Sequence, residues 1–130
     1  LMGAVAFQKG LGVTHSCAHA LSTVHDMHHG LANAVMLEAC LRFNGETEGG
    51  RLKKMAQAIG LGSAAKLNSN QFIEAVVKLR DNVGIKGGLK NYGVSDLDPL
   101  VKVAINDFCH TENPRTVSEQ DFMNIYKAAL

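Results

Sequence analysis

The stretch from His15 to Asn44, HSCAHALSTVHDMHHGLANAVMLEACLRFN, decides how the rest of this 130-residue chain is interpreted. It holds five of the six histidines in the protein: His15, His19, His25, His28 and His29. The neutral imidazole nitrogen binds zinc, iron and copper, and histidine titrates near neutral pH. A local cluster of histidines therefore indicates a site for metal binding or proton transfer.

The spacing of three of these histidines predicts a reversal of the chain. On a helix, His15 and His19 differ by only about 40° in direction and face the same side. A continuous helix would place His29 roughly 15 Å beyond His19, whereas a bond from imidazole to zinc measures about 2.0 to 2.1 Å. A shared metal therefore requires the chain to turn back between Thr23 and His29. We expect Asp26 to be the N-cap of a second helix, with His29 in its first turn.

Several motifs resemble the C-terminal helical domain of the iron-containing (group III) alcohol dehydrogenases. The segments are GVTHSCAHAL at 12–21, HDMHHGLANA at 25–34 and LRFN at 41–44. They reproduce the family's two histidines four residues apart, followed by a third histidine directly before a glycine. The tail agrees as well, because Asp107, Cys109 and Asn113-Pro114-Arg115 resemble the family's closing D-x-C-x3-N-P-R segment. The resemblance runs from near Leu11 to Leu130.

The resemblance implies a role for each of the three histidines. His15 and His29 fall on metal ligands, and the metal is expected to be Fe(2+) or Zn(2+). His19 falls on the histidine beside the substrate and the nicotinamide, where we expect it to help relay the alcohol proton. Two positions depart from the family pattern: Ala20-Leu21-Ser22 stands where many members read Pro-Leu-Gly, and His28 stands where many have proline.

The resemblance also implies what the chain does and what it lacks. We expect the metal-binding helical portion of an NAD(P)-dependent alcohol dehydrogenase, which interconverts primary alcohols and aldehydes by hydride transfer. The family's other two metal ligands, spaced D-x3-H, and its glycine-rich half that binds NAD or NADP belong upstream of this segment. Residues 1–130 are thus expected to be a single helical metal-binding domain. We further expect this domain to be a fragment without the nucleotide-binding domain, inactive when isolated and a homo-oligomer at full length.

The composition excludes several other classes of function. Thirteen basic and 12 acidic residues nearly balance, without a basic run and without tryptophan, so we expect neither nucleic acid nor a membrane surface as a partner. Polar residues interrupt the apolar run from Leu31 to Leu41, which is far shorter than the roughly 20 residues that span a bilayer. The odd number of cysteines, with no C-x2-C pair, argues against a disulfide framework and favours a reducing cytoplasm. The cysteines are Cys17, Cys40 and Cys109.

The pattern of apolar residues predicts an all-α, multi-helix, bundle-like domain, because no stretch alternates long enough to propose a strand. We expect a third helix from Met27 that Asn44-Gly45 ends, a polar loop at 46–50, and a separate helix around Leu52 to Ile59. The other expected helices cover 1–9, the region up to about His25, a segment capped by Ser69 or Asn70 and ended by Gly84, Ser95 to Cys109, and a last helix after Ser118.

Particular side chains of these helices carry further predictions. Stripes of residues are expected to face the core, and Ser118 with Asp121 is expected to form a capping box. We interpret Cys17 as buried filler, and Arg115 as fixing the turn after Asn113-Pro114. We interpret His25 and His28 as exposed residues or as residues that orient their neighbours. The stripe residues are Phe72, Val76, Leu79 and Val83; then Leu97, Leu100, Val101, Ala104 and Phe108; and finally Phe122, Ile125, Tyr126 and Ala129.

Two alternatives to the dehydrogenase remain open on the sequence. The first is a non-enzymatic helical domain in which His15, His19 and His29 bind metal adventitiously or only pack. Taken without the family resemblance, a pair such as His15 and His19 is more often hydrogen-bonded on a half-buried helix than bound to metal. The second is a hydrolytic metalloenzyme with three histidines and a water, which would lack an evident carboxylate base.

Overall fold

The computed structural model describes residues 1–63 and 66–130 of the chain. Within these residues it contains α-helices and short 3-10 helices and no strand, which confirms the all-α prediction. The α-helices are α1 (Met2–Phe7), α2 (Val13–His25), α3 (His29–Ala58), α4 (Ser69–Asn82), α5 (Asp98–Asn106) and α6 (Glu119–Ala128), and the 3-10 helices are η1 (Leu89–Tyr92) and η2 (Phe108–Glu112).

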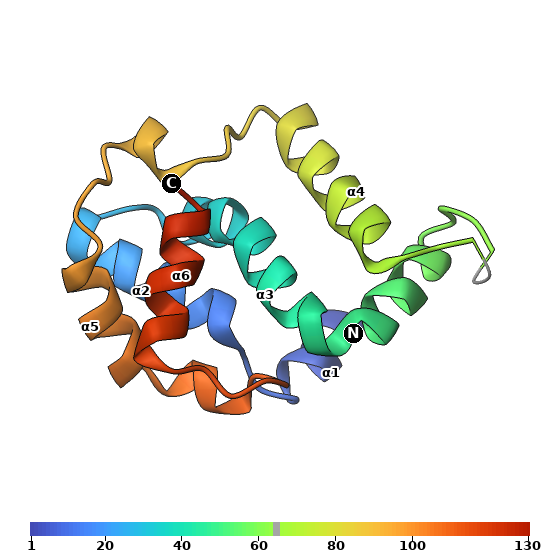
Figure 1. Ribbon diagram of the computed structural model, residues 1–130, viewed down its shortest axis with the longest axis horizontal. Helices are drawn as coiled ribbons and strands as arrows, with labels where there is room; N and C mark the ends of the chain where they lie inside the picture. The colour runs from blue at the N-terminus through green and yellow to red at the C-terminus, as the bar shows by residue number, and fades with distance from the viewer. Residues whose placement is uncertain (64–65) are drawn as a thin grey trace.

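The long helix α3 runs through the middle of the molecule (Figure 1). Helices α2 and α6 pack against it, α5 packs against both α2 and α6, and α4 packs along α3 on the opposite side. None of the helices described is both long and apolar enough to cross a membrane. The histidine-bearing helix α2 is therefore held between α3 and α5.

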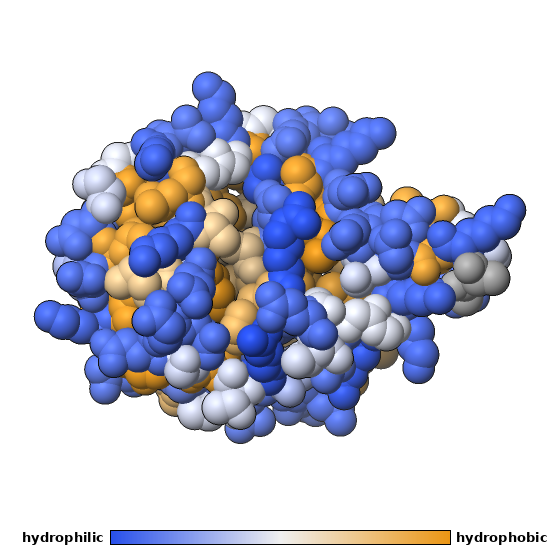
Figure 2. Space-filling view, in the orientation of Figure 1, coloured by the Kyte–Doolittle hydropathy of each residue, from blue (hydrophilic) through white to orange (hydrophobic). Residues whose placement is uncertain are grey.

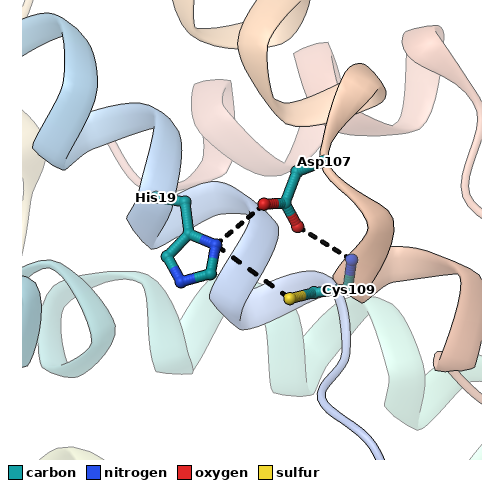
Figure 3. A group of neighbouring side chains, drawn as sticks. All are labelled: His19, Asp107 and Cys109. Carbon is teal, nitrogen blue, oxygen red and sulfur yellow. Dashed lines mark hydrogen bonds and ion pairs between the residues drawn. The ribbon is translucent and has the colours of Figure 1, made fainter.

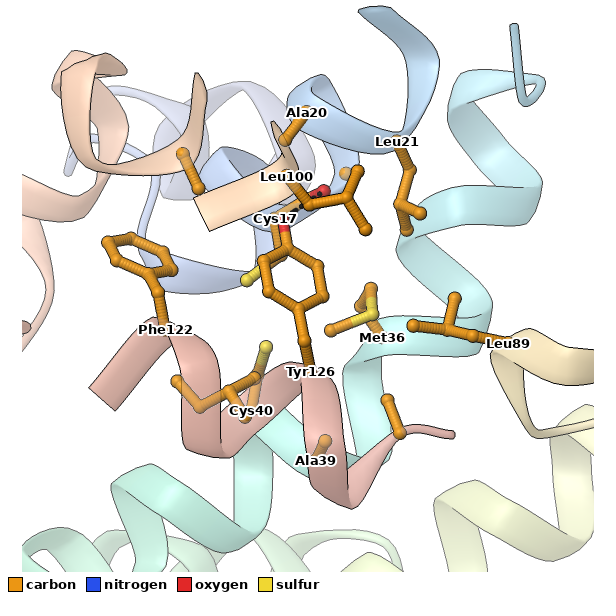
Figure 4. Packing of buried hydrophobic residues seen from close by; sticks show 14 of the residues in the cluster. Cys17, Ala20, Leu21, Met36, Ala39, Cys40, Leu89, Leu100, Phe122 and Tyr126 are labelled. Atoms are coloured by element: carbon orange, nitrogen blue, oxygen red, sulfur yellow. Dashed lines mark hydrogen bonds between the residues drawn. The ribbon is translucent and has the colours of Figure 1, made fainter. Parts of the chain in front are cut away.

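The core lies where α2, α3, α5 and α6 meet (Figure 4). Tyr126 and Phe122 of α6 are fully buried there, as are Leu21, Met36 and Leu100. The Tyr126 hydroxyl donates a hydrogen bond to the backbone carbonyl of Cys17 at 3.1 Å. Cys17 itself is fully buried, so its predicted role as core filler is confirmed. These contacts fix the last helix to the helix that carries His15 and His19.

The predicted reversal between α2 and α3 is confirmed. Helix α2 ends at His25, and Asp26 follows in the left-handed conformation (φ 52°, ψ 29°). The backbone N–H groups of Asp26 and Met27 both donate to the carbonyl of Leu21, and the Ser22 hydroxyl donates to the Met27 carbonyl at 2.9 Å. The prediction that Asp26 caps the second helix is wrong. Aspartate tolerates positive φ, so Asp26 instead closes α2, and His28 occupies the N-cap position of α3.

Helix α3 is longer than predicted, because Asn44-Gly45 does not end it. The Asn44 side chain forms a pair of hydrogen bonds with Asn113 and so does not cap the helix. Leu52 packs closely over Gly45, where an added Cβ would lie 3.0 Å from Leu52 Cδ1. The helix only bends, at Glu48 (φ −105°, ψ 21°), within the segment predicted as a polar loop.

The N-cap of helix α4 lies one residue before the first of the two caps predicted for it. Asn68, and not Ser69 or Asn70, forms a reciprocal capping box with Gln71. The predicted inward stripe is wrong at its end, because Leu79 and Val83 are 63% and 64% exposed. Among the described residues α4 packs mainly on α3, which leaves this edge of the helix uncovered. Figure 2 shows hydrophobic side chains at the surface beside α4.

Helix α5 is shorter than the predicted Ser95 to Cys109. It ends at Asn106, because Asp107 adopts an extended backbone and starts the 3-10 helix η2. Phe108, predicted to face inward, is 76% exposed as a result. The other four stripe residues of this region are buried as predicted: Leu97, Leu100, Val101 and Ala104.

The last helix agrees with its prediction. Ser118 and Asp121 form the expected capping box at the start of α6. The four residues of its predicted inward stripe are all buried: Phe122, Ile125, Tyr126 and Ala129.

Candidate metal and proton-transfer site

The turn between α2 and α3 brings His15, His19 and His29 together. Their ring centroids lie 5.9 Å apart for His15 and His19, 5.5 Å for His15 and His29, and 5.2 Å for His19 and His29. His29 is in the first turn of α3, as predicted, although His28 and not Asp26 is the N-cap of that helix. His15 and His29 line one side of a broad cleft of about 740 Å³, together with Leu11, Asn33 and other residues.

The surroundings of His15 favour its neutral form. Burial lowers the pKa of His15 below its ordinary value, and the neighbouring His29 and His19 lower it further, while Asp107 opposes them. A metal binds the neutral imidazole. The ring is thus held in the protonation state that a ligand needs.

His29 has a neighbour that the sequence did not single out. The Asn33 amide nitrogen lies 3.0 Å from His29 Nε2 and 3.0 Å from the His29 carbonyl. An amide nitrogen only donates, so His29 Nε2 accepts and is unprotonated. Asn33 lies one helical turn after His29 on the same face of α3, and this spacing was the available signal.

His19 is held by groups from the far end of the chain (Figure 3). Its Nδ1 lies 2.8 Å from Asp107 Oδ2. Asp107 Oδ1 accepts hydrogen bonds from the Ser16 hydroxyl at 2.7 Å and from the Cys109 backbone N–H at 2.8 Å. Sequence reasoning quoted Asp107 and Cys109 as part of the family tail but gave them no role, because nothing in the sequence places the tail beside α2.

Hydrogen bonding keeps Asp107 ionised and its neighbouring thiol protonated. Burial acts to raise the pKa of Asp107, but hydrogen bonds from Ser16, His19 and Cys109 outweigh it and lower the pKa to about 2. Burial, the hydrogen bond to Asp107 and the charge of Asp107 raise the pKa of the Cys109 thiol to about 11. A thiolate next to this carboxylate is therefore disfavoured.

Two groups of side chains are therefore candidates for a cation. Donor atoms of His19, Asp107 and Cys109 lie within 4.8 Å of one another. Asp107 already accepts three hydrogen bonds, however, and the thiol is protonated, so this group is better suited to support His19 than to bind metal. His15 and His29 offer imidazole nitrogens at the cleft, which is suitable donor chemistry for iron or zinc. Such a catalytic site has three or four protein ligands, so this pair fits about half of one.

The tail motif anchors both histidine-bearing helices. Asn113 Oδ1 accepts a hydrogen bond from the Val13 backbone N–H at the start of α2, and the Asn113 amide also pairs with Asn44 of α3. Arg115 donates to the Phe43 carbonyl at 2.8 Å, and its guanidinium carbon lies 3.9 Å above the Phe43 ring. The Arg115 guanidinium thus binds a carbonyl of α3, and the turn before it is closed by the Asn113 amide, which donates to the Arg115 carbonyl at 2.7 Å. The hydrogen bond from Val13 to Asn113 holds the first turn of α2, the helix that carries His15.

Comparison with known proteins identifies this architecture. Residues 1–130 match the C-terminal part of the Fe-containing alcohol dehydrogenase family, so the whole chain is matched. The chain belongs to that family and corresponds to its C-terminal helical portion.

Several characterised proteins and solved structures are similar to this chain. Lactaldehyde reductase from Escherichia coli (strain K12) is 33% identical over 125 residues, which cover 92% of this chain and 33% of that protein. NAD-dependent methanol dehydrogenase from Bacillus methanolicus is 33% identical over 99% of this chain and 35% of its own length. A crystal structure of 1,3-propanediol oxidoreductase superposes with a TM-score of 0.85 at 30% identity, over 92% of this chain and 33% of that chain. The chain thus spans about a third of the length of the relatives it matches.

Proposed function

We propose that this chain is the metal-binding helical portion of an NAD(P)-dependent alcohol dehydrogenase that interconverts primary alcohols and aldehydes. Family membership supports the class of reaction, and the convergence of His15, His19 and His29 supports the site. In this proposal residues 1–130 form a single domain that lacks a nucleotide-binding domain. Alone it is inactive, because half of the metal ligands are missing.

His15 and His29 are the residues of this chain that would hold Fe(2+) or Zn(2+). The divalent metal supplies Lewis acidity toward a substrate oxygen when it is bound. The two rings are suited to this task by their placement, since their centroids lie 5.5 Å apart and both residues line the cleft. The remaining ligands come from outside these residues, as the resemblance implies.

His19 is the catalytic residue in this proposal. Its Nδ1 is engaged by Asp107, so Nε2 on the other side of the ring is the atom that exchanges a proton with the substrate hydroxyl. The ionised Asp107 stabilises the imidazolium that forms when Nε2 accepts a proton. A nicotinamide cofactor, NAD or NADP, would supply the group that accepts or donates the hydride.

The proposal extends to cofactor, assembly and location. The names of two relatives, NAD-dependent methanol dehydrogenase and NADPH-dependent butanol dehydrogenase, support a nicotinamide cofactor of either kind. The full-length protein is proposed to be a cytoplasmic homo-oligomer that acts on a small alcohol or aldehyde. Neither nucleic acid nor a membrane is proposed as a partner.

The test replaces each proposed ligand in the complete protein. His15→Ala and His29→Ala are expected to lose bound metal and alcohol-dependent reduction of NAD(P), with helix content by circular dichroism unchanged. His28→Ala is the matched control, because His28 is an exposed neighbour of His29 outside the three ring contacts. Unchanged metal content and activity in His29→Ala would remove His29 from the chemistry and favour the non-enzymatic alternative.

A further inference from the structure

We propose that Asp107 is a positioning residue that holds His19 in the tautomer with the proton on Nδ1, so that Nε2 is free to accept the substrate proton. This inference rests on the proposed function of His19. It concerns a residue that touches neither the proposed metal ligands nor, in the proposal, the substrate. Asp107 acts only through the histidine ring.

The pattern of donors around Asp107 dictates the tautomer. An ionised carboxylate only accepts hydrogen bonds. Asp107 Oδ1 is occupied by the Ser16 hydroxyl and the Cys109 backbone N–H, and Oδ2 lies 2.8 Å from His19 Nδ1. A proton on Nδ1 completes this third hydrogen bond. The other tautomer would set a nitrogen lone pair against a carboxylate oxygen at the same distance.

The carboxylate is itself fixed from two parts of the fold. Ser16 precedes His19 by three residues on α2 and is fully buried. The Cys109 N–H belongs to η2, which begins where the extended backbone of Asp107 ends α5. Because one donor is a buried side chain of α2 and the other a backbone N–H of η2, the orientation of the His19 ring is set by the fold before any ligand binds.

The substitution Asp107→Asn reverses this arrangement while keeping the shape of the side chain. The asparagine oxygen is expected to keep the two donors, Ser16 and the Cys109 N–H. Its amide group would then face His19 Nδ1 and donate to it, which forces the ring proton onto Nε2. His19 could no longer accept a proton at Nε2 during alcohol oxidation. We expect kcat to fall about 100-fold or more, with little change in KM for the alcohol.

The experiment reads the tautomer directly in the complete protein. Long-range ¹H–¹⁵N correlation spectra of histidine-labelled, zinc-loaded protein are expected to show the proton of His19 on Nδ1 in the wild type and on Nε2 in Asp107→Asn. Asp121→Asn is the matched control, since Asp121 also accepts hydrogen bonds from a serine hydroxyl and a backbone N–H, in the α6 capping box. It is expected to leave both the tautomer and kcat unchanged.

Each result supports or overturns the inference. If His19 of the wild type carries its proton on Nε2, the inference is wrong. This result needs no variant, so the inference can be tested even if Asp107→Asn does not fold. A loss of kcat in Asp107→Asn with the tautomer unchanged assigns Asp107 a merely structural role and also overturns it. Failure of the proposed function gives a different result. In that case His19→Ala would retain kcat, while the ring proton of His19 would still move from Nδ1 in the wild type to Nε2 in Asp107→Asn.

Discussion

Asn113 accepts a hydrogen bond from the backbone N–H of Val13, which lies 100 residues earlier in the chain, at a distance of 3.3 Å. The first N–H groups of a helix have no partner within the helix. At the start of α2 the side chain of Asn113 accepts one of these hydrogen bonds, as the side chain of an N-cap residue would. Gly12, just before the helix, leaves room for it, since a Cβ there would lie 3.0 Å from Asn113 Oδ1.

Removing this side chain is expected to destabilise the fold. Asn113→Ala leaves the Val13 N–H and the Asn44 amide without their partner, at a cost of about 1 to 3 kcal/mol in the free energy of unfolding. Urea denaturation measures the loss. Asn124→Ala, which removes an exposed asparagine bonded only to Gln120, is expected to change stability by less than about 0.5 kcal/mol. Equal effects of the two substitutions would show that the Asn113 contacts do not stabilise the protein.

The buried hydroxyl of Tyr126 supports a second prediction. Tyr126→Phe removes its hydrogen bond to the Cys17 carbonyl, and we expect a loss of about 1 kcal/mol in unfolding free energy. Burial raises the pKa of Tyr126, so the hydroxyl is a neutral donor across the working pH range. Tyr92→Phe is the matched control, because the Tyr92 hydroxyl bonds the Lys86 carbonyl at an exposed site. The prediction is wrong if the control loses as much stability as Tyr126→Phe.

Asp107 is expected to make stability depend on pH in the acid range. Its pKa falls from 3.8 to about 2 on folding, so the unfolded chain binds the proton more tightly. The stabilisation is complete above about pH 4 and is lost as pH falls toward 2. The side chain is only 15% exposed, so the shift corresponds to about 2 kcal/mol. The gap in unfolding free energy between wild type and Asp107→Asn should therefore narrow between pH 6 and pH 3, and a constant gap would contradict this assignment.

Helix α4 offers a contrast between a buried and an exposed apolar residue. Ile73 is 2% exposed and Leu79 is 63% exposed. Ile73→Ala is expected to cost about 2 to 5 kcal/mol, whereas Leu79→Ala should cost less than about 0.5 kcal/mol in the 130-residue chain. Chemical denaturation of both variants checks the difference. A large cost for Leu79→Ala in this chain would mean that its side chain is covered, contrary to the structure.

Sequence reasoning succeeded where the signal was local. The Ser118–Asp121 capping box and the inward stripe of α6 follow from spacing within a few residues. The reversal before His29 was expected because His15 and His29 could share a metal only if the chain turned back between them. Sequence reasoning failed where a distant group overrode a local preference. Asn44-Gly45 has the composition of a helix end, but the Asn44 side chain pairs with Asn113, 69 residues further along the chain, and the helix continues.

The same distinction separates the two parts of the site. The convergence of His15, His19 and His29 was expected from the family resemblance, which implies a metal shared by His15 and His29, and the structure shows it. The support of His19 by Asp107 was not, because 88 residues separate the two in the chain. The sequence singled out Asp107 only as part of the family's D-x-C segment, and the resemblance did not predict which residue Asp107 contacts.

Anomalous diffraction from crystals of the complete protein loaded with zinc tests most directly whether His15 and His29 bind the same metal ion. We expect one metal peak within about 2.0 to 2.1 Å of an imidazole nitrogen of both His15 and His29, with His19 close by but not bound. A peak held instead by His19, Asp107 and Cys109, or a metal that contacts only one of His15 and His29, would contradict this expectation.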